Sequence, residues 1–292
     1  MRSANAATGR HNRPVHTLQP LIDFLHRHPR LLVLTGAGCS TAAGIPDYRD
    51  EQGRWKRAEP MRHQTFVGSA LARQHYRARS MQGWPALAAA RPTAAHHALA
   101  RLEQAGRIVQ LVTQNVDGLH QAAGSRAVVD LHGRLDTVVC LGCAARTPRA
   151  ALQQELQRRN PHWLAPEAAR LPDGDADLRD LDFSRFEVPH CPRCGGVLKP
   201  DVVFFGDSVP RERVAAVREA LAQADAVLVA GSSLMVYSGY RFVEEAAASG
   251  KPVAAINRGR TRADTLLTLK VEMDVGAALQ QLAQAGTGAR AA

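Results

Sequence analysis

The sequence predicts an α/β fold in which a parallel sheet carries helices on both faces and a smaller module is added to it. Short apolar runs of strand length alternate with helical segments along most of the chain, which is typical of parallel sheets. Small or polar residues directly follow several of these runs. The alternation stops between residues 140 and 195, where two Cys-x-x-Cys pairs occur. We therefore expect one large sheet domain and one small module within the 292 residues.

The composition is that of a globular protein, and no apolar run reaches the roughly 18 residues that would predict a membrane span. The formal net charge is +10, yet only four of the 37 basic residues are lysines: Lys56, Lys199, Lys251 and Lys270. An arginine-rich bacterial composition accounts for this charge, and attraction to acidic partners is the alternative. Since no basic cluster is interleaved with aromatic residues, we expect no specific nucleic-acid binding.

The first elements are indicated by their apolar patterns. Apolar residues recur at helical spacing over residues 18–28. The continuous apolar run Leu31–Leu34 predicts a buried parallel strand, because such strands are covered on both faces. It ends in the glycine turn Thr35–Gly38. Glycines and prolines predict a loop over 44–60, and residues 63–90 are expected to be helical with interruptions.

The remaining elements follow the same alternation. Pro92 and Gly106 delimit a helix over Thr93–Ala105. The further strands that we predict are Ile108–Thr113, Val128–Leu131, Val202–Phe205, Ala226–Ala230 and Val253–Ile256, and the further helices are Arg211–Ala222, 239–248 and 275–284. Strands that alternate with helices imply a parallel sheet with right-handed crossovers.

The domains that we expect are not contiguous in sequence. A Rossmann-like nucleotide-binding domain, with helices on both faces of its sheet, is predicted over 18–62, 92–137 and 200–285. The small domain combines a helical insertion over 63–91 with a four-cysteine zinc module over 138–199, in which residues 160–190 form a long insertion. A disordered leader over 1–17 and a flexible tail over 286–292 complete the chain.

The paired cysteines predict a metal site. Cys140 and Cys143 form one Cys-x-x-Cys pair, and Cys191 and Cys194 form the other. Each pair suits a zinc knuckle, and two knuckles together give a tetrahedral site with four thiolate ligands. Such a closed site is structural, because it leaves no position open for water. A redox Cys-x-x-Cys is the alternative, which the presence of two pairs disfavours, and metal binding by thiols fits a reducing compartment.

Two glycine-containing segments suit a phosphate-bearing ligand. Gly36, Ala37, Gly38 and Ser40 follow the first strand, where glycines let the backbone approach a pyrophosphate. A tight strand–helix turn is the alternative. Residues 44–49 then display Asp47, Tyr48 and Arg49 on a loop stiffened by Pro46, as expected of a movable lid, although an ordinary polar turn has the same composition.

Polar residues also follow four later strands, where ligands bind in open α/β sheets. Gln114, Asn115 and Asp117 come after the second strand and suit ribose hydroxyls or an amide, with helix capping as the alternative. His132 ends the third strand and is a candidate general base, although the other histidines compete with it on composition alone. The adenosine half of a dinucleotide suits two further strand-end turns, which include Gly231, Ser232, Ser233, Asn257, Arg258 and Gly259. Simple turns remain the alternative for each.

Taken in order, these motifs resemble the sirtuin family. The resemblance covers roughly residues 20–285 and rests on GAGCSTAAGIPDYR, TQNVDGLH, LHG, the two Cys-x-x-Cys pairs, KPDVVFFGD, GSSLMVYS and INRG. The closer resemblance is to class II sirtuins, the branch with a mitochondrial lipoamidase and ADP-ribosylating enzyme. It rests on Tyr48, on Ser238 where many members have proline, and on the insertion around Pro161–Pro189, which contains Pro172–Asp175. Asp207 departs from the commoner glutamate and puts the acyl preference in doubt.

The resemblance implies a role for each site residue. The pyrophosphate side of NAD would lie at Gly36, Ala37, Gly38 and Ser40, and nicotinamide at Ile45 and Asp47. Tyr48 and Arg49 would belong to the mobile loop. Gln114, Asn115 and Asp117 would position the nicotinamide ribose. The adenosine end would be served by Gly231, Ser232, Ser233, Asn257 and the backbone of Val275. The substrate peptide would pair with Val202, Val203, Phe204, Phe205 and Gly206 as an added strand.

The resemblance also implies the reaction of an NAD-dependent protein lysine deacylase. The acyl oxygen of a modified lysine attacks C1′ of the nicotinamide ribose and expels nicotinamide, and His132 then removes a proton from the ribose diol. The neighbouring hydroxyl attacks the alkylimidate carbon, and water releases lysine and O-acyl-ADP-ribose. NAD is thus a consumed cosubstrate, and one zinc ion is structural. Protein mono-ADP-ribosyltransfer at the same site and a non-catalytic NAD-binding or zinc-ribbon interaction protein are the alternatives.

One residue pair bears on the acyl group. Tyr76 and Arg79 are three residues apart in a helical stretch and so share a face. They resemble the acidic-acyl reader of desuccinylating sirtuins, in which arginine contacts a carboxylate. An exposed helix in an arginine-rich protein is the alternative. We expect acyl-lysine proteins as partners, no membrane association, a monomer, and a cytoplasmic location in a bacterium, with the mitochondrial matrix as the alternative.

Overall fold

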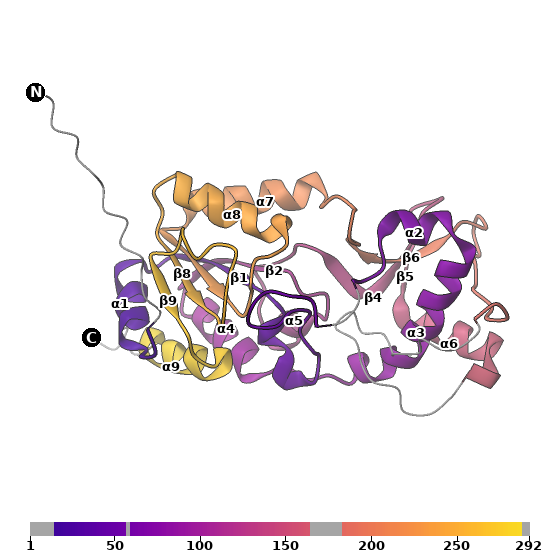
Figure 1. The fold of residues 1–292 in the computed structure, drawn as a ribbon, viewed down its shortest axis with the longest axis horizontal. Coiled ribbons are helices and arrows are strands. Elements are labelled where there is room, and N and C mark those ends of the chain that lie inside the picture. Colours follow the sequence, from indigo (N-terminus) through magenta and orange to yellow (C-terminus); the bar gives the residue numbers. More distant parts are fainter. Residues whose placement is uncertain (1–14, 57–58, 164–182, 288–292) are drawn as a thin grey trace, which may run out of the picture.

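A computed structural model describes residues 15–56, 59–163 and 183–287 of the chain. Its main feature is a six-stranded parallel sheet with the strand order β3-β2-β1-β7-β8-β9 (Figure 1). The strands are β1 (Leu31–Thr35), β2 (Ile108–Thr113), β3 (Val128–Asp130), β7 (Ala226–Ala230), β8 (Val253–Ile256) and β9 (Leu269–Val271). Every residue of β1, β7 and β8 is buried, which explains why these strands appear in the sequence as continuous apolar runs.

Helices cover both faces of this sheet (Figure 1). One face packs against α1 (Gln19–Arg27), α4 (Ala94–Gln104) and α9 (Val275–Thr287). The other face packs against α7 (Arg211–Gln223) and α8 (Tyr237–Ala248). Each face has its own cluster of buried apolar side chains, as a two-sided α/β sheet requires.

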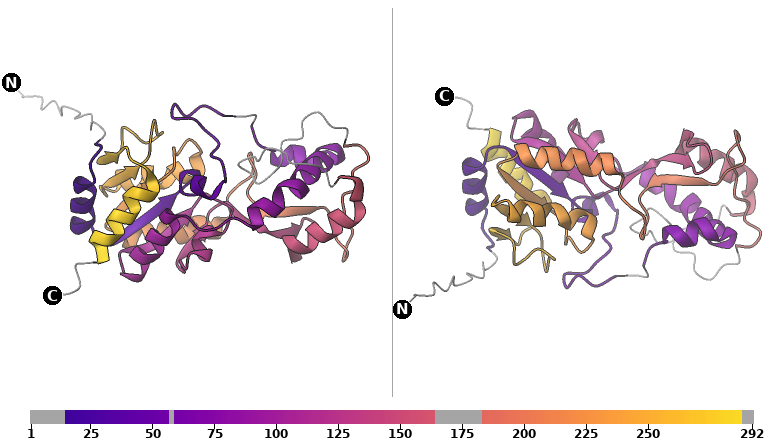
Figure 2. Two further views of the ribbon diagram at one scale, coloured as in Figure 1. Left: turned by 90° about the horizontal axis from the view of Figure 1, so that it is seen from below. Right: turned by 90° about the horizontal axis from the view of Figure 1, so that it is seen from above.

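A smaller unit lies at one end of the long axis of the molecule (Figure 2). It contains an antiparallel sheet of order β5-β4-β6, formed by β4 (Gly133–Cys140), β5 (Arg146–Pro148) and β6 (Leu198–Val202). The helices α2 (His63–Gly68), α3 (Ala70–Ala88) and α6 (Arg149–Arg159) belong to the same unit. Short helical segments are α5 (Leu119–Ala122), η1 (Ala37–Cys39), η2 (Thr41–Ala43) and η3 (Pro161–Trp163).

The structure corrects several sequence predictions. The strand predicted over Val202–Phe205 is wrong, because the strand is Leu198–Val202 and pairs antiparallel with β4 in the small sheet. The small sheet begins at Gly133, so the division predicted at residue 138 comes too late. The sequence pattern predicts neither β9 nor α6, since β9 is only three residues long and α6 is rich in arginine and glutamine.

The predicted terminal segments and insertion fall largely outside the described part of the chain. Residues 1–14, 288–292 and 164–182 lie outside the described residues, and they include most of the predicted leader, tail and insertion together with Pro172–Asp175. The predicted leader is too long, because Val15 forms a parallel bridge with Val271 at the edge strand β9. Among the described residues, no helix is long and apolar enough to cross a membrane.

Three of the four lysines are held within the fold. Lys199 is buried, and its amine donates to a backbone carbonyl of the small sheet. Lys270 is also buried and forms an ion pair with Asp264 at 3.2 Å. The amine of Lys251 donates to the carbonyl of Ala222 at 3.2 Å. These amines therefore act as structural groups.

Gly133 connects the two sheets, because it follows the end of β3 and begins β4. Its φ is +83°, and it pairs with Val202 in β6. A Cβ atom at this position would lie 2.0 Å from the carbonyl oxygen of Asp201, which is backbone and cannot swing aside. Only glycine fits here, and the preceding residue, His132, is thereby fixed at the junction of the two sheets.

We predict that Gly133→Ala lowers the free energy of unfolding by more than about 3 kcal/mol, because left-handed strain and backbone overlap add together. Gly124→Ala is the matched control, since Gly124 has φ +100° but no atom within 4 Å of the position that a Cβ atom would take. The control should lose only about 1–2 kcal/mol. Urea unfolding measures both, and equal losses would contradict the assigned overlap.

Candidate functional site

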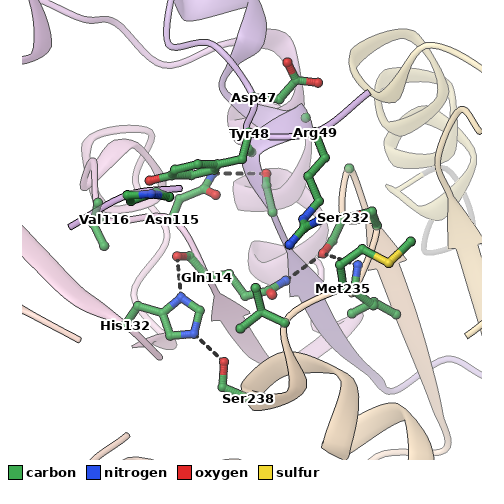
Figure 3. Close-up of a pocket in the computed structure, with 18 of the residues that line it drawn as sticks. Asp47, Tyr48, Arg49, Gln114, Asn115, Val116, His132, Ser232, Met235 and Ser238 are labelled. Atoms are coloured by element: carbon green, nitrogen blue, oxygen red, sulfur yellow. Dashed lines mark hydrogen bonds between the residues drawn. The ribbon is translucent and has the colours of Figure 1, made fainter. Parts of the chain in front are cut away.

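A cavity of about 1510 Å³ lies at the carboxyl ends of the parallel strands and extends toward the small sheet (Figure 3). Of the predicted nucleotide-side residues, Gly259 does not line the cavity. The others line it: Gly36, Ala37, Gly38, Ser40, Ile45, Pro46, Asp47, Tyr48, Arg49, Gln114, Asn115, Asp117, Gly231, Ser232, Ser233, Asn257, Arg258 and Val275. His132 and the predicted peptide segment, residues 202–206, line it too. Segments far apart in the sequence thus meet at one edge of the sheet.

The floor of the cavity is formed by two strand-end turns in direct backbone contact. The amide of Gly38 donates to the carbonyl of Gly231 at 2.9 Å. A Cβ atom on Gly38 would lie 2.8 Å from the Cα atom of Gly231, and one on Gly36 would lie 2.7 Å from the Cβ atom of Ser232. The glycines therefore let the turns after β1 and β7 pack together, besides leaving room for a ligand.

The polar side chains after β2 form a connected network. Asn115 donates through Nδ2 to the carbonyl of Gly36 at 3.1 Å and to Oγ of Ser40 at 3.0 Å. The Ser40 hydroxyl donates to a carboxylate oxygen of Asp117 at 2.7 Å. Asp117 also accepts the amide of Leu119 at 2.9 Å, so it caps the following helical turn, as the alternative interpretation expected. The same side chains thus serve the fold and face the cavity.

Two buried histidines, His96 and His120, lie beside this network. The rings of His96 and His120 have centroids 4.6 Å apart. Burial lowers the pKa of His96 to about 4 and the pKa of His120 well below its ordinary value. His96 Nδ1 accepts the backbone amide of Thr93 at 3.1 Å, so its Nε2 carries the proton that faces Ser40. Both rings are therefore neutral hydrogen-bonding groups at neutral pH.

His132 lies in the cavity wall between two hydrogen bonds, as Figure 3 shows. Its Nδ1 is 2.9 Å from the carbonyl oxygen of Gln114, and its Nε2 is 2.7 Å from Oγ of Ser238. The pKa of His132 is lowered to about 4, mainly by desolvation; the hydrogen bond to Gln114 raises it, and the charges of Arg213 and Arg241 add to the lowering. At neutral pH the ring is uncharged, as a general base must be.

The predicted lid folds back on itself through contacts that the sequence analysis does not predict. Arg49 lies 3.8 Å above the ring of Trp55 and donates to the carbonyl of Gly53 at 2.8 Å. The carboxylate of Asp47 is held by Lys56 at 2.5 Å, and the amine of Lys56 is partly exposed. An arginine-rich loop gives no signal for such pairing, although an isolated Trp in a polar segment is itself a hint of a specific contact.

The lid also touches the segment predicted to hold a peptide. The rings of Trp55 and Phe205 meet edge to face with centroids 5.5 Å apart. The carbonyl of Phe205 accepts the amide of His63 at 2.9 Å, and the amide of Val203 donates to the carbonyl of His132 at 2.8 Å. The segment after β6 is therefore tied to the start of α2 and to the junction of the two sheets, although it is not itself a strand.

Of the predicted acyl-reading pair, Tyr76 and Arg79, only one residue lines the cavity. Tyr76 is buried, lines the cavity and packs its ring against Phe66 and Phe204 at centroid distances of 5.3 and 5.4 Å. Arg79 is half-buried and is not among the residues that line the cavity in the described part of the chain. The structure thus brings Tyr76, but not Arg79, to the site.

The four paired cysteines come together in the small unit. Their sulfur atoms lie within 4.8 Å of one another, with Cys140 and Cys194 at 3.4 Å and Cys143 and Cys191 at 3.8 Å. A Cβ atom on Gly196 would lie 2.9 Å from the sulfur of Cys140, so the knuckle needs glycine there. Four sulfur ligands at this spacing are positioned to bind one zinc ion, as predicted.

Comparisons with known proteins agree with this geometry. A model described as the Sir2 family matches residues 36–238. The chain is 62% identical over 266 residues to an NAD-dependent protein deacetylase of Xanthomonas axonopodis pv. citri (strain 306), with 91% of each chain covered. It is 64% identical over 254 residues to one of Bordetella bronchiseptica (strain ATCC BAA-588 / NCTC 13252 / RB50), with 87% of this chain and 93% of the relative covered.

Solved structures show the same fold. One, described as "Sir2-p53 peptide-NAD+", has a TM-score of 0.72 and 26% identity, with 92% of this chain and 98% of that chain covered. Another, described as "Structure of Sir2Tm bound to a propionylated peptide", has a TM-score of 0.71 and 26% identity, with the same coverage.

We predict that the purified protein contains one zinc ion per chain and that Cys194→Ser loses it, because three thiolates no longer close the site. Loss of zinc should lower the melting temperature, since a structural ion contributes directly to folding. Zinc content by mass spectrometry and a thermal melt measure this. Cys39→Ala, at a buried cysteine outside the cluster, is the control that should keep its zinc. Full zinc content in Cys194→Ser would exclude the four-cysteine site.

Proposed function

The chain belongs to the Sir2 family, and on that premise we propose that it is an NAD-dependent protein deacetylase that transfers the acyl group of a modified lysine to ADP-ribose. The observation that carries this proposal is the neutral, half-buried His132 in the wall of the cavity. The relatives with which the chain shares more than 60% identity are named for the same activity.

The cavity suits NAD by size and by its polar groups. Its volume of about 1510 Å³ exceeds the roughly 300–1,000 Å³ of a typical ligand pocket, so it has room for a dinucleotide and an acyl-lysine side chain together. We assign the pyrophosphate to the turn around Gly38, and the nicotinamide ribose to Asn115 and Asp117. The adenosine end belongs at Ser232 and Asn257, which also line the cavity.

The residues of the chain then account for the reaction. When bound, NAD supplies nicotinamide as a leaving group and the ribose that accepts the acyl group. Nε2 of neutral His132 can accept a proton from a ribose hydroxyl at neutral pH. The resulting imidazolium is stabilised by its Nδ1–H, which donates to the carbonyl of Gln114. Tyr48, Trp55 and Phe205 pack together at the cavity and help to exclude water.

The peptide is assigned to the extended segment after β6. Residues 203–206 line the cavity, and two structural relatives are described as peptide complexes. An acyl-lysine peptide that pairs with this segment would place its side chain between Phe204 and His132. The acyl preference is assigned to the aromatic wall that includes Tyr76, which favours apolar acyl groups.

We further propose that the protein acts as a monomer in the cytoplasm of a bacterium. Four cysteines grouped for a metal ion suit a reducing compartment. The large apolar side chains that are exposed among the described residues, Val67, Leu71, Leu141 and Tyr237, come from different elements. Gel filtration and cell fractionation test these two assignments.

We predict that the purified protein, given NAD and a panel of acyl-lysine peptides, releases nicotinamide, unmodified peptide and the matching O-acyl-ADP-ribose. His132→Ala should reduce product formation by about 10²–10⁴-fold, the usual contribution of a general base. His97→Ala, which removes an exposed histidine on α4, should retain activity. Mass spectrometry of the products measures all three.

Two results would overturn the proposal. Intact peptides with no nicotinamide released across the whole panel would indicate a non-catalytic protein. ADP-ribose attached to the protein or peptide, without loss of the acyl group, would indicate a mono-ADP-ribosyltransferase instead. A further ranking of the acyl groups by rate would show whether the aromatic wall around Tyr76 favours apolar chains.

A further inference from the structure

Ser238 contacts the proposed general base directly. It lies in the first turn of α8, which begins at Tyr237, and it lines the same cavity as His132. Its hydroxyl oxygen is 2.7 Å from Nε2 of His132, which is the shorter of the two hydrogen bonds of that ring. Figure 3 shows the two side chains pointing toward one another. The basic nitrogen is therefore already engaged before any substrate is bound.

The direction of this hydrogen bond follows from the other side of the ring. Nδ1 of His132 faces the carbonyl oxygen of Gln114, which can only accept, so Nδ1 carries the proton. In the neutral ring Nε2 then has a lone pair and no proton. The hydroxyl of Ser238 must therefore donate to Nε2. Gln114 therefore selects the tautomer, and Gln114 and Ser238 together hold one ring orientation.

The charged groups around the ring also favour its neutral form. Arg213 on α7 and Arg241 on α8 both disfavour the protonated form of His132 by their charge. Arg241 follows Ser238 by three residues, so both side chains lie on the same side of α8. The hydrogen bond to Gln114 is the interaction that favours the protonated form of His132. A hydroxyl that donates to the Nε2 lone pair further stabilises the neutral form of the ring.

We propose that Ser238 is a positioning residue for the reaction: its hydroxyl fixes the orientation of His132 in the tautomer that Gln114 sets, and it keeps Nε2 unprotonated until a ribose hydroxyl takes its place. The inference rests on the proposed function. When the ribose hydroxyl arrives, it donates to the same lone pair, and the proton moves from that oxygen to Nε2. The hydroxyl of Ser238 is then released to bind water or substrate, and it is neither oxidised nor acylated.

This role has a consequence for pH that a purely structural role lacks. Without the hydroxyl, the neutral form of His132 loses a stabilising hydrogen bond, so the pKa of His132 rises from its value of about 4. The acid limb of the rate profile must then move to higher pH. The variant should therefore be most impaired near pH 5 and recover part of its activity near pH 8.

The test compares wild type with Ser238→Ala, Ser238→Thr and the control Ser249→Ala. Ser249 follows the far end of α8, does not line the cavity, and donates its hydroxyl to the carbonyl of Glu245. Two rates are measured as functions of pH with one acyl-lysine peptide: O-acyl-ADP-ribose formation, and exchange of labelled nicotinamide into NAD. Exchange reports nicotinamide cleavage, which comes before the proton transfer to His132.

We expect Ser238→Ala to reduce product formation about threefold to tenfold, the range that one hydrogen bond contributes, and to reduce exchange by a smaller factor. Its acid limb should shift upward by at least about half a pH unit. Ser238→Thr, which keeps the hydroxyl, should restore the wild-type pH profile. Ring nitrogen–proton NMR spectra of the free protein, with His132→Ala used to assign the signal, should show the Nδ1–H tautomer in wild type and a raised His132 pKa in Ser238→Ala.

Loss of both rates in equal proportion with an unchanged pH profile would overturn the role of Ser238 and leave the proposed function intact. The same conclusion follows if NMR finds the His132 pKa unchanged in Ser238→Ala. Failure of the proposed function gives a different result, because the wild type itself would then form no O-acyl-ADP-ribose.

Discussion

The backbone contact between the turns after β1 and β7 is the constraint on which the site depends. Gly38 and Gly231 approach so closely that no side chain fits between them. This contact fixes the spacing of the two strand ends that face the cavity, and Asn115 from the next strand is then tied to the carbonyl of Gly36. A site assembled from four strand ends thus has its geometry set by backbone atoms, which side-chain motion does not disturb.

Around this rigid floor, charged and neutral polar side chains line the cavity. The three histidines of the site are neutral: His96 and His120 are buried, His132 is half-buried, and desolvation lowers the pKa of each. A buried charge would need an ion partner, whereas a neutral imidazole needs only a donor and an acceptor at fixed positions. The tautomers of His96 and His132 are each set by a backbone group. Desolvation thus keeps the ring of His132 neutral, as its proposed role requires.

Local sequence patterns were enough to predict the strands whose burial shows in their own residues. The strands β7 and β8 were placed correctly to the residue, because a fully buried parallel strand requires a continuous apolar run. The bounds of β2 were also correct, although two of its residues are only half-buried. The segment Val202–Phe205 has the same appearance, yet its pairing is decided by β4, which is distant in the sequence, and by the geometry at Gly133. Apolarity predicts burial there but not the sheet or the direction of pairing.

The candidate site shows the same division between local and non-local information. Strand-end position was sufficient to predict that His132, one of twelve histidines, lies at the cavity, because strand ends converge in any open parallel sheet. It was not sufficient for Ser238 or Trp55, whose roles depend on which side chain lies opposite. The helical spacing of Tyr76 and Arg79 suggested a shared face, but the cavity wall includes only the first of them.

The placement of the lysines makes the molecule resistant to acylation of its side-chain amines. Lys199 and Lys270 are buried, the amine of Lys251 is bonded to backbone carbonyls, and the exposed side chain of Lys56 on the lid is paired with Asp47. Activated acyl donors react with free amines, whereas guanidinium groups stay protonated below about pH 12 and do not react. Acylation of all four lysines would lower the formal charge only from +10 to +6. In a cell where acyl donors accumulate, the charge and solubility of this protein would stay nearly constant while those of lysine-rich proteins change.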